Sequence, residues 1–197
     1  MHPRDRCGRF SYSDLLRDYV IGPTSSAAVR TEALRTTGLA DPRFSAYYDV
    51  DLFLRTALLR PDNVGAIPSP LTFYRRHGSQ MSKDWVFLQG EWRRLLEKHR
   101  RLAPAATASV EAQADANMTR YFAYLAYENR DFRNALNLLN GALAASPAAF
   151  LADRRNWIAY CASLAGFLFP GFVRCRLERL AGISAGDTSV SRDSSHC

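Results

Sequence analysis

Charged residues occur in two short segments whose composition could support chemistry. Asp49 opens a stretch with helical periodicity, where backbone N–H groups hold a carboxylate and leave it facing a cleft. Such a carboxylate can accept a proton, or it can simply cap its helix. Arg75, Arg76 and His77 follow a strand-like segment and precede Gly78. Forked arginine donors and a histidine can close over a diphosphate, and the alternative is a solvated basic edge.

Helical periodicity predominates in the elements that would position these residues. We expect a short helix over residues 9–20 with a cap at Ser11 or Ser13, a helix that starts at Asp49, and a helix from Trp85 to Leu102. The helix at Asp49 should carry an apolar stripe and, at i, i+4 spacing, an ion pair between Asp51 and Arg55. The stripe comprises Leu52, Thr56 and Leu59, with Phe53 and Ala57 beside it.

Strand patterns are few. Residues 64–67 and 71–74 are short strand candidates joined by Pro68-Ser69-Pro70. The expected fold is therefore mainly α with a small β element of two or three strands around residues 64–77.

Residues 20–82 contain three segments, in order, that resemble the second half of the catalytic domain of family-2 glycosyltransferases. The first resembles the run before the family's acidic motif, and it comprises Ile21 to Arg30, Ala33-Leu34 and Gly38-Leu39. The second, Tyr48 to Arg55 (YDVDLFLR), resembles E-D-x-D-L-x-L-R. The third, Ile67 to Ser82 (IPSPLTFYRRHGSQMS), resembles I-P-x-P-L-x-x-Y-R-x-H followed by a short polar loop.

The resemblance implies inverting sugar transfer from a nucleotide-sugar donor to an acceptor hydroxyl of a saccharide, a lipid-linked glycan or a protein. Asp49 matches the family's general base, which takes the proton of the attacking hydroxyl. Arg75, Arg76 and His77, together with Asp51, are candidate substrate-binding residues. His77 is also a candidate metal ligand.

The second segment departs from the family pattern at Tyr48, where the family usually has Glu, and this removes one charge from the acidic cluster. Asp49-Val50-Asp51 spells D-x-D, the form of the metal-binding motif in such enzymes. That motif ends a buried apolar strand, and residues 44–48 are not such a strand, so we do not interpret it as a metal site.

The resemblance covers only the acceptor side of such an enzyme. We expect the donor-binding half, with its Mg²⁺ or Mn²⁺, to lie outside these residues, and no cofactor to bind this chain tightly. The fold would then be a truncated α/β catalytic domain of the glycosyltransferase-A type. The chain alone should be inactive.

The C-terminal part resembles one tetratricopeptide unit over Tyr121 to Pro147, preceded by an Ala/Pro/Thr-rich boundary at residues 103–108. Two helices are expected between Val110 and Ser146, with a turn near Asn129. A third, apolar helix from about Phe150 to Phe169 should cover the open face of this pair, because a single repeat cannot bury its own apolar side.

An uncharged run of 17 residues, Trp157 to Val173, lies between arginines on both sides. It is at the short limit for a membrane span, so a buried or interfacial helix is favoured. The basic flanks would suit an anionic bilayer surface.

Composition limits the other classes of protein. The net charge is +7, and the arginines are scattered without a recognition motif, which argues against nucleic-acid binding. The four cysteines form no C-x-x-C pair, which favours reduced thiols and a cytoplasmic protein, peripheral to the inner face of the membrane if it meets one.

Three regions are expected: residues 1–102 as the acceptor-side catalytic part, residues 109–183 as the helical tail, and residues 184–197 as a disordered end. The function predicted from the resemblance is glycosyl transfer in envelope or surface polysaccharide assembly. The alternative is a non-catalytic helical interaction or membrane-surface module derived from such an enzyme.

Overall fold

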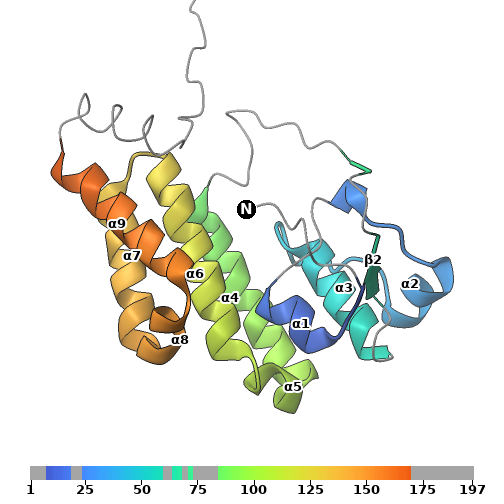
Figure 1. The fold of residues 1–197 in the computed structure, drawn as a ribbon. Coiled ribbons are helices and arrows are strands. Elements are labelled where there is room, and N and C mark those ends of the chain that lie inside the picture. Colours follow the sequence, from blue (N-terminus) through green and yellow to red (C-terminus); the bar gives the residue numbers. More distant parts are fainter. Residues whose placement is uncertain (1–7, 19–23, 60–63, 68–70, 73–83, 170–197) are drawn as a thin grey trace, which may run out of the picture.

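The computed structural model describes residues 8–18, 24–59, 64–67, 71–72 and 84–169, and this part of the chain is mainly helical (Figure 1). The first elements are β1 (Gly8–Phe10), α1 (Tyr12–Arg17), the 3₁₀ helix η1 (Thr24–Ser26), α2 (Thr31–Thr37), α3 (Tyr48–Leu59) and β2 (Val64–Ala66). They are followed by α4 (Trp85–Leu102), α5 (Pro104–Ala108), α6 (Glu111–Glu128), α7 (Phe132–Ala145), α8 (Pro147–Ala152) and α9 (Arg154–Leu168). The prediction of a mainly α chain with a small β element is confirmed.

The small sheet pairs β1 with β2 in antiparallel register, with Arg9 opposite Gly65. The predicted strand at residues 64–67 is therefore confirmed, but its partner is β1 and not the predicted segment 71–74. Leu71 and Thr72 are not in a strand, and the rest of that segment lies outside the described residues. Three-residue strands carry too little alternation for the sequence to identify the partner.

Helix α1 begins at the predicted cap. The Ser11 hydroxyl oxygen accepts a hydrogen bond from the Asp14 N–H at 3.2 Å, and the Asp14 carboxylate accepts one from the Ser11 N–H at 3.1 Å. This reciprocal capping box satisfies two N–H groups that the first turn would leave free. The helix buries Tyr12, Leu15 and Leu16.

Helix α3 forms where it was predicted, and three residues of its predicted stripe, Phe53, Thr56 and Ala57, are buried, but the centre of the buried face is shifted. Leu54 is fully buried, whereas Leu59 is 40% exposed and Leu52 is half-buried. The remaining buried positions are Val50, Asp51, Phe53, Thr56 and Ala57. A charged residue thus lies on the inner face of this helix, and its partners decide how α3 is held.

Helix α4 supplies the partners of Asp51 and also connects the elements before α5 with the helices that follow it. It runs into α5, which occupies the expected boundary at residues 103–108. The Thr107 hydroxyl donates to the His99 carbonyl at 2.9 Å and lies 2.7 Å from the Tyr12 hydroxyl. One hydrophobic cluster includes residues from both sides of α5, among them Phe10, Leu15, Leu54, Leu95, Ala114, Phe122 and Leu125. The division into three regions stays a prediction, and residues 184–197 lie outside the described residues.

The tail consists of α6 and α7 as an antiparallel pair, with a turn at Asn129 and Arg130 as expected. The prediction of one helix over residues 150–169 was wrong. Its residues belong to α8 and α9, because the Asp153 carboxylate caps a new helix by accepting the Arg155 N–H at 2.9 Å. Helix α9 packs on α7 and α6, so an apolar helix does lie over the pair (Figure 1).

Candidate functional site

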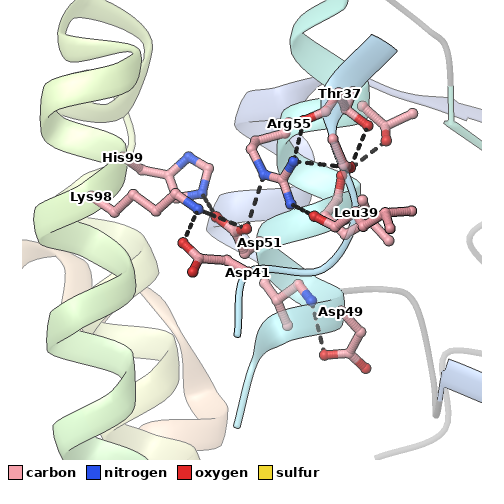
Figure 2. Close-up of polar contacts among 12 residues, drawn as sticks. Thr37, Leu39, Asp41, Asp49, Asp51, Arg55, Lys98 and His99 are labelled. Atoms are coloured by element: carbon pink, nitrogen blue, oxygen red, sulfur yellow. Dashed lines mark hydrogen bonds and ion pairs between the residues drawn. The ribbon is translucent and has the colours of Figure 1, made fainter. Parts of the chain in front are cut away.

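Asp49 lies in the first turn of α3 and is half-buried (Figure 2). Two hydrogen bonds orient its carboxylate. Oδ2 accepts from the Thr24 hydroxyl at 2.6 Å, and Oδ1 accepts from the N–H of Val50 at 2.8 Å. The Val50 N–H belongs to the first turn, where the backbone has no partner of its own and the helix dipole favours a negative charge. Asp49 therefore accepts a hydrogen bond from one of the free N–H groups of the first turn, as a capping residue does, while its carboxylate stays accessible to solvent.

Tyr47 directs the chain into α3. Its backbone has φ +59°, in the left-handed region, and its carbonyl accepts the first helical bond, from Asp51 N–H at 2.9 Å. Its ring meets the edge of Trp92 at a centroid distance of 6.1 Å, and burial raises the pKa of the Tyr47 hydroxyl well above its ordinary value. The next residue, Tyr48, is 40% exposed, so the position where the resembled family usually has Glu faces solvent.

Asp51, the other candidate on α3, is fully buried in a charged cluster (Figure 2). Its carboxylate accepts from Arg55 Nε at 2.9 Å, which confirms the predicted i, i+4 ion pair. From α4, Lys98 Nζ reaches Oδ1 at 2.8 Å, and His99 Nε2 lies 3.2 Å from the same oxygen. Burial alone would raise the pKa of Asp51, but the hydrogen bonds from His99 and Lys98 and the charge of Arg55 outweigh it, and this pKa is lowered.

Arg55 extends the cluster to the end of α2. Its guanidinium donates to the carbonyls of Thr37, of Gly38 at 3.3 Å and of Leu39 at 2.9 Å (Figure 2). Carbonyls at the end of a helix lack intrahelical partners and carry the negative end of its dipole, so a cation stabilises them. Helix α2 buries no residue of its own, and Arg55 is thus a principal link between α2 and α3.

The segment before α3 is attached to α4 by two further carboxylates. Asp41 accepts from Lys98 Nζ at 2.9 Å and from Arg43 at 2.7 Å, and these bonds, Arg43 first, hold its pKa far below the ordinary range. Glu91 on α4 accepts the N–H groups of Ser45 at 2.7 Å and Ala46 at 3.1 Å. The position of Asp49 is therefore set from α4.

Sequence reasoning missed the α4 side of this arrangement. The helix was predicted, but His99 was given no role, and Lys98, Glu91 and Asp41 were not considered. A signal was present, because Glu91 and His99 occur at helical spacing within the apolar stripe of α4. Polar residues on an apolar stripe require buried partners. The stripe comprises Leu88, Trp92, Leu95 and Leu96.

The third predicted segment cannot be compared with this geometry, since Arg75, Arg76 and His77 lie outside the described residues. Among the described residues, no group of three or more His, Cys, Asp or Glu side chains could hold a metal ion. The metal assignment and the substrate-binding roles of Arg75, Arg76 and His77 stay predictions, whereas the Asp51 carboxylate is fully buried and engaged by Arg55, Lys98 and His99.

A groove of about 940 Å³ runs along the outer side of α4, and Asp49 is not among its lining residues. Its walls are mostly charged, and several of its cations are already paired: Arg100 with Glu111, and Arg101 with Glu97 at 2.7 Å. Because these cations already have partners, we consider Asp49 the better candidate for chemistry.

The geometry brings together two of the three segments that carry the resemblance. Thr24 of the first segment binds Asp49 of the second, and Arg55 of the second binds the carbonyls of Gly38 and Leu39 of the first. Comparison with protein-family models, curated protein sequences and solved structures gives no match. The functional reading therefore depends on these residues and their contacts.

Proposed function

We propose that this chain is the acceptor-side part of a family-2-like, inverting glycosyltransferase and that Asp49 is its general base. The observation that supports the proposal is the Asp49 carboxylate itself. It is oriented by Thr24 and by the first turn of α3, and it remains half-exposed. Asp51, two residues further on, is by contrast fully buried among its partners and inaccessible to an acceptor hydroxyl.

In the proposed reaction, an acceptor hydroxyl attacks the anomeric carbon of a nucleotide sugar from the face opposite the diphosphate. The new C–O bond forms as the bond to the diphosphate breaks, and the hydroxyl proton passes to Asp49. Each carboxylate oxygen accepts one hydrogen bond and has a further lone pair, so one can receive this proton. Thr24 and Val50 keep the carboxylate aimed during the transfer.

Donor binding is assigned to another half of the enzyme, since the sheet among the described residues has only two three-residue strands. Mg²⁺ or Mn²⁺ bound there would neutralise the leaving diphosphate. Arg75, Arg76 and His77 would contribute from this chain. The proposed setting is the cytoplasm, with saccharide, protein or lipid-linked acceptors, in envelope or surface polysaccharide assembly.

The test is Asp49→Asn in the enzyme that joins this chain to its donor-binding half. Asparagine keeps the size of the side chain and much of its hydrogen bonding, but it cannot take up the proton. Turnover of the nucleotide sugar should fall by about 10²–10⁴, while the melting temperature should change by no more than a few degrees, because Asn and Asp are similar at a helix start.

Asp84 offers a matched control at the start of another helix. Its carboxylate accepts the Phe87 N–H at 3.0 Å and caps α4. Asp84→Asn should therefore leave turnover close to that of the wild type. A fully active Asp49→Asn enzyme would show that Asp49 is only part of a cap and would remove the catalytic assignment.

The isolated chain should neither hydrolyse a nucleotide sugar nor transfer from it. Turnover by the purified chain that Asp49→Ala abolishes would contradict the assignment of donor binding to another half.

A second candidate is a non-catalytic interaction module derived from such an enzyme. The outer face of α9, with six exposed large apolar side chains, favours it as a role for the tail. If the enzyme is active and its Asp49→Asn form is inactive, residues 1–102 are not a non-catalytic module.

A further inference from the structure

Helix α9 has the reverse of the usual distribution of side chains. The residues it buries are Asn156, Ser163 and Gly166, which are polar or small. The large apolar side chains point outward, and they are Trp157, Ile158, Leu164, Phe167, Leu168 and Phe169, with exposed fractions of 39–62%. We call these six residues the α9 outer face. A helix at the edge of a water-soluble bundle normally buries such side chains and exposes the polar ones.

The small inner face is what lets α9 approach the bundle closely. A Cβ atom on Gly166 would lie 2.5 Å from the ring of Phe132 on α7, so this glycine is required for the contact. The Asn156 amide donates to the Phe150 carbonyl at 2.9 Å and is fixed in place. The helix is therefore anchored by its polar side, and it cannot rotate to bury the outer face without losing these contacts.

The outer face has the composition of a membrane-interface helix. Between Asn156 and Phe169 the sequence has no charged residue. The Trp157 ring, 44% exposed, packs between Phe150 at 5.9 Å and Tyr160 at 6.5 Å, which gives the face a rigid aromatic group of the kind enriched at bilayer interfaces. No helix among the described residues is long and apolar enough to cross a membrane.

The sequence on both sides of this uncharged stretch of α9 is basic. From Asp153 to Arg179 the sequence has five arginines and two acidic residues. Arg154, at the first turn of α9, is exposed. Basic residues that flank an apolar helical face add electrostatic attraction to anionic lipids.

We propose that the α9 outer face docks this protein on an anionic phospholipid bilayer, with α9 lying in the plane of the interface. The helix is at the opposite end of the described structure from α2 and β2 (Figure 1). Docking through α9 therefore leaves the Asp49 side of the molecule uncovered. The inference does not depend on the proposed sugar transfer, because it concerns a different surface and is read out without turnover.

The experiment measures binding of the full chain to two kinds of vesicle, phosphatidylcholine alone and phosphatidylcholine mixed with phosphatidylglycerol. Co-sedimentation should show binding to the anionic vesicles, weakened by added salt. Tryptophan emission should shift to the blue, and lipids brominated in their chains should quench it, as Trp157 enters the interface.

Two double variants distinguish binding by the α9 outer face from nonspecific binding by other exposed apolar side chains. Ile158→Asn with Leu168→Asn removes the two most exposed side chains of the face, each 62% exposed, and should weaken vesicle binding by at least about tenfold. The control, Val86→Asn with Leu102→Asn, changes apolar side chains of α4 that are 60% and 49% exposed and should bind like the wild type. Circular dichroism shows whether each variant keeps its fold.

Four results would contradict the proposal. The first is no binding of the wild type to anionic vesicles. The second is equal binding by the folded α9 variant. The third is a dimer in analytical ultracentrifugation that the α9 substitutions dissociate, with no vesicle binding, which would assign the face to a second copy of this chain. Equal affinity for neutral vesicles would refute the role of anionic lipid.

Discussion

The region around α3 and the region around α7 and α9 are stabilised by different kinds of contact. Around α3, charged and directional contacts attach the chain to α4: Asp51 binds Lys98 and His99, and Glu91 accepts two backbone N–H groups. Around α7 and α9, packing predominates, through Phe150, Leu139 and several alanines, with Gly166 set against Phe132. Arg120, which binds Asp153 at 2.9 Å, is the main buried cation of the tail.

The difference matches what each end has to do. Hydrogen bonds and ion pairs fix direction, so they can hold the backbone before α3 in one arrangement and aim Asp49. Apolar packing stabilises without fixing direction, and small residues on the inner face let α9 approach closely and leave its large side chains outside. One end is suited to positioning a group and the other to presenting a surface.

The largest expected effect comes from removing the centre of the charged cluster. Asp51→Ala leaves Lys98, Arg55 and His99 without their shared carboxylate in a buried site. Breaking a buried pair by deleting one partner typically costs about 3–5 kcal/mol, and chemical denaturation followed by circular dichroism would measure the loss.

Glu97→Ala is the matched control for that substitution. Glu97 pairs with Arg100 and Arg101, but its side chain is 50% exposed, so its removal should change stability little. Equal effects of the two substitutions would contradict the central role of Asp51.

A smaller effect should follow from adding one methyl group to the contact between α9 and α7. Gly166→Ala forces the Phe132 ring to move, and overpacking of this kind typically costs about 1–3 kcal/mol. Gly141→Ala in α7 meets nothing within 4 Å and should instead stabilise the chain by about 0.5–1 kcal/mol, since Ala is the better helix former. Thermal unfolding should show a lower melting temperature for Gly166→Ala and a higher one for Gly141→Ala. A stabilising Gly166→Ala would refute the close packing of α9.

Acid should weaken the α3 end first. Asp41, Asp51 and Glu91 have lowered pKa values in the folded state, with ordinary values of 3.8 for Asp and 4.5 for Glu. A lowered folded pKa contributes stability that is present above the ordinary pKa and is lost as the pH falls toward the folded one. In the tail, hydrogen bonds from Arg155 lower the pKa of Asp153 to about 2.

Hydrogen exchange between about pH 5 and about pH 3 would test this order. Amides of α3 should lose protection before those of α6 and α7, and Asp51→Asn should show a shallower dependence of stability on pH than the wild type. Simultaneous loss at both ends would mean that the charged cluster does not control the acid response.

Local signals in the sequence determined most of the helices. The Ser11 capping box, the periodicity from Trp85 to Leu102 and the break at Asn129-Arg130 involve residues a few positions apart, so their physics is visible without the fold. The Asp51–Arg55 pair is local in the same sense, and it was predicted. The division at Asp153 was missed because it depends on a cap that a single side chain provides.

Tertiary structure alone decided what surrounds the candidate site. Asp51 meets His99 across 48 positions, and Thr24 meets Asp49 across 25. The pairing of β1 with β2 spans a similar distance, and three residues per strand could not specify it. Periodicity indicates that a helix has an inner face, but which side turns inward depends on the volumes that neighbouring helices offer. In α9, the space beside Phe132 accepts only a glycine, and together with the buried Asn156 and Ser163 that requirement turns the large apolar side chains to the outer face.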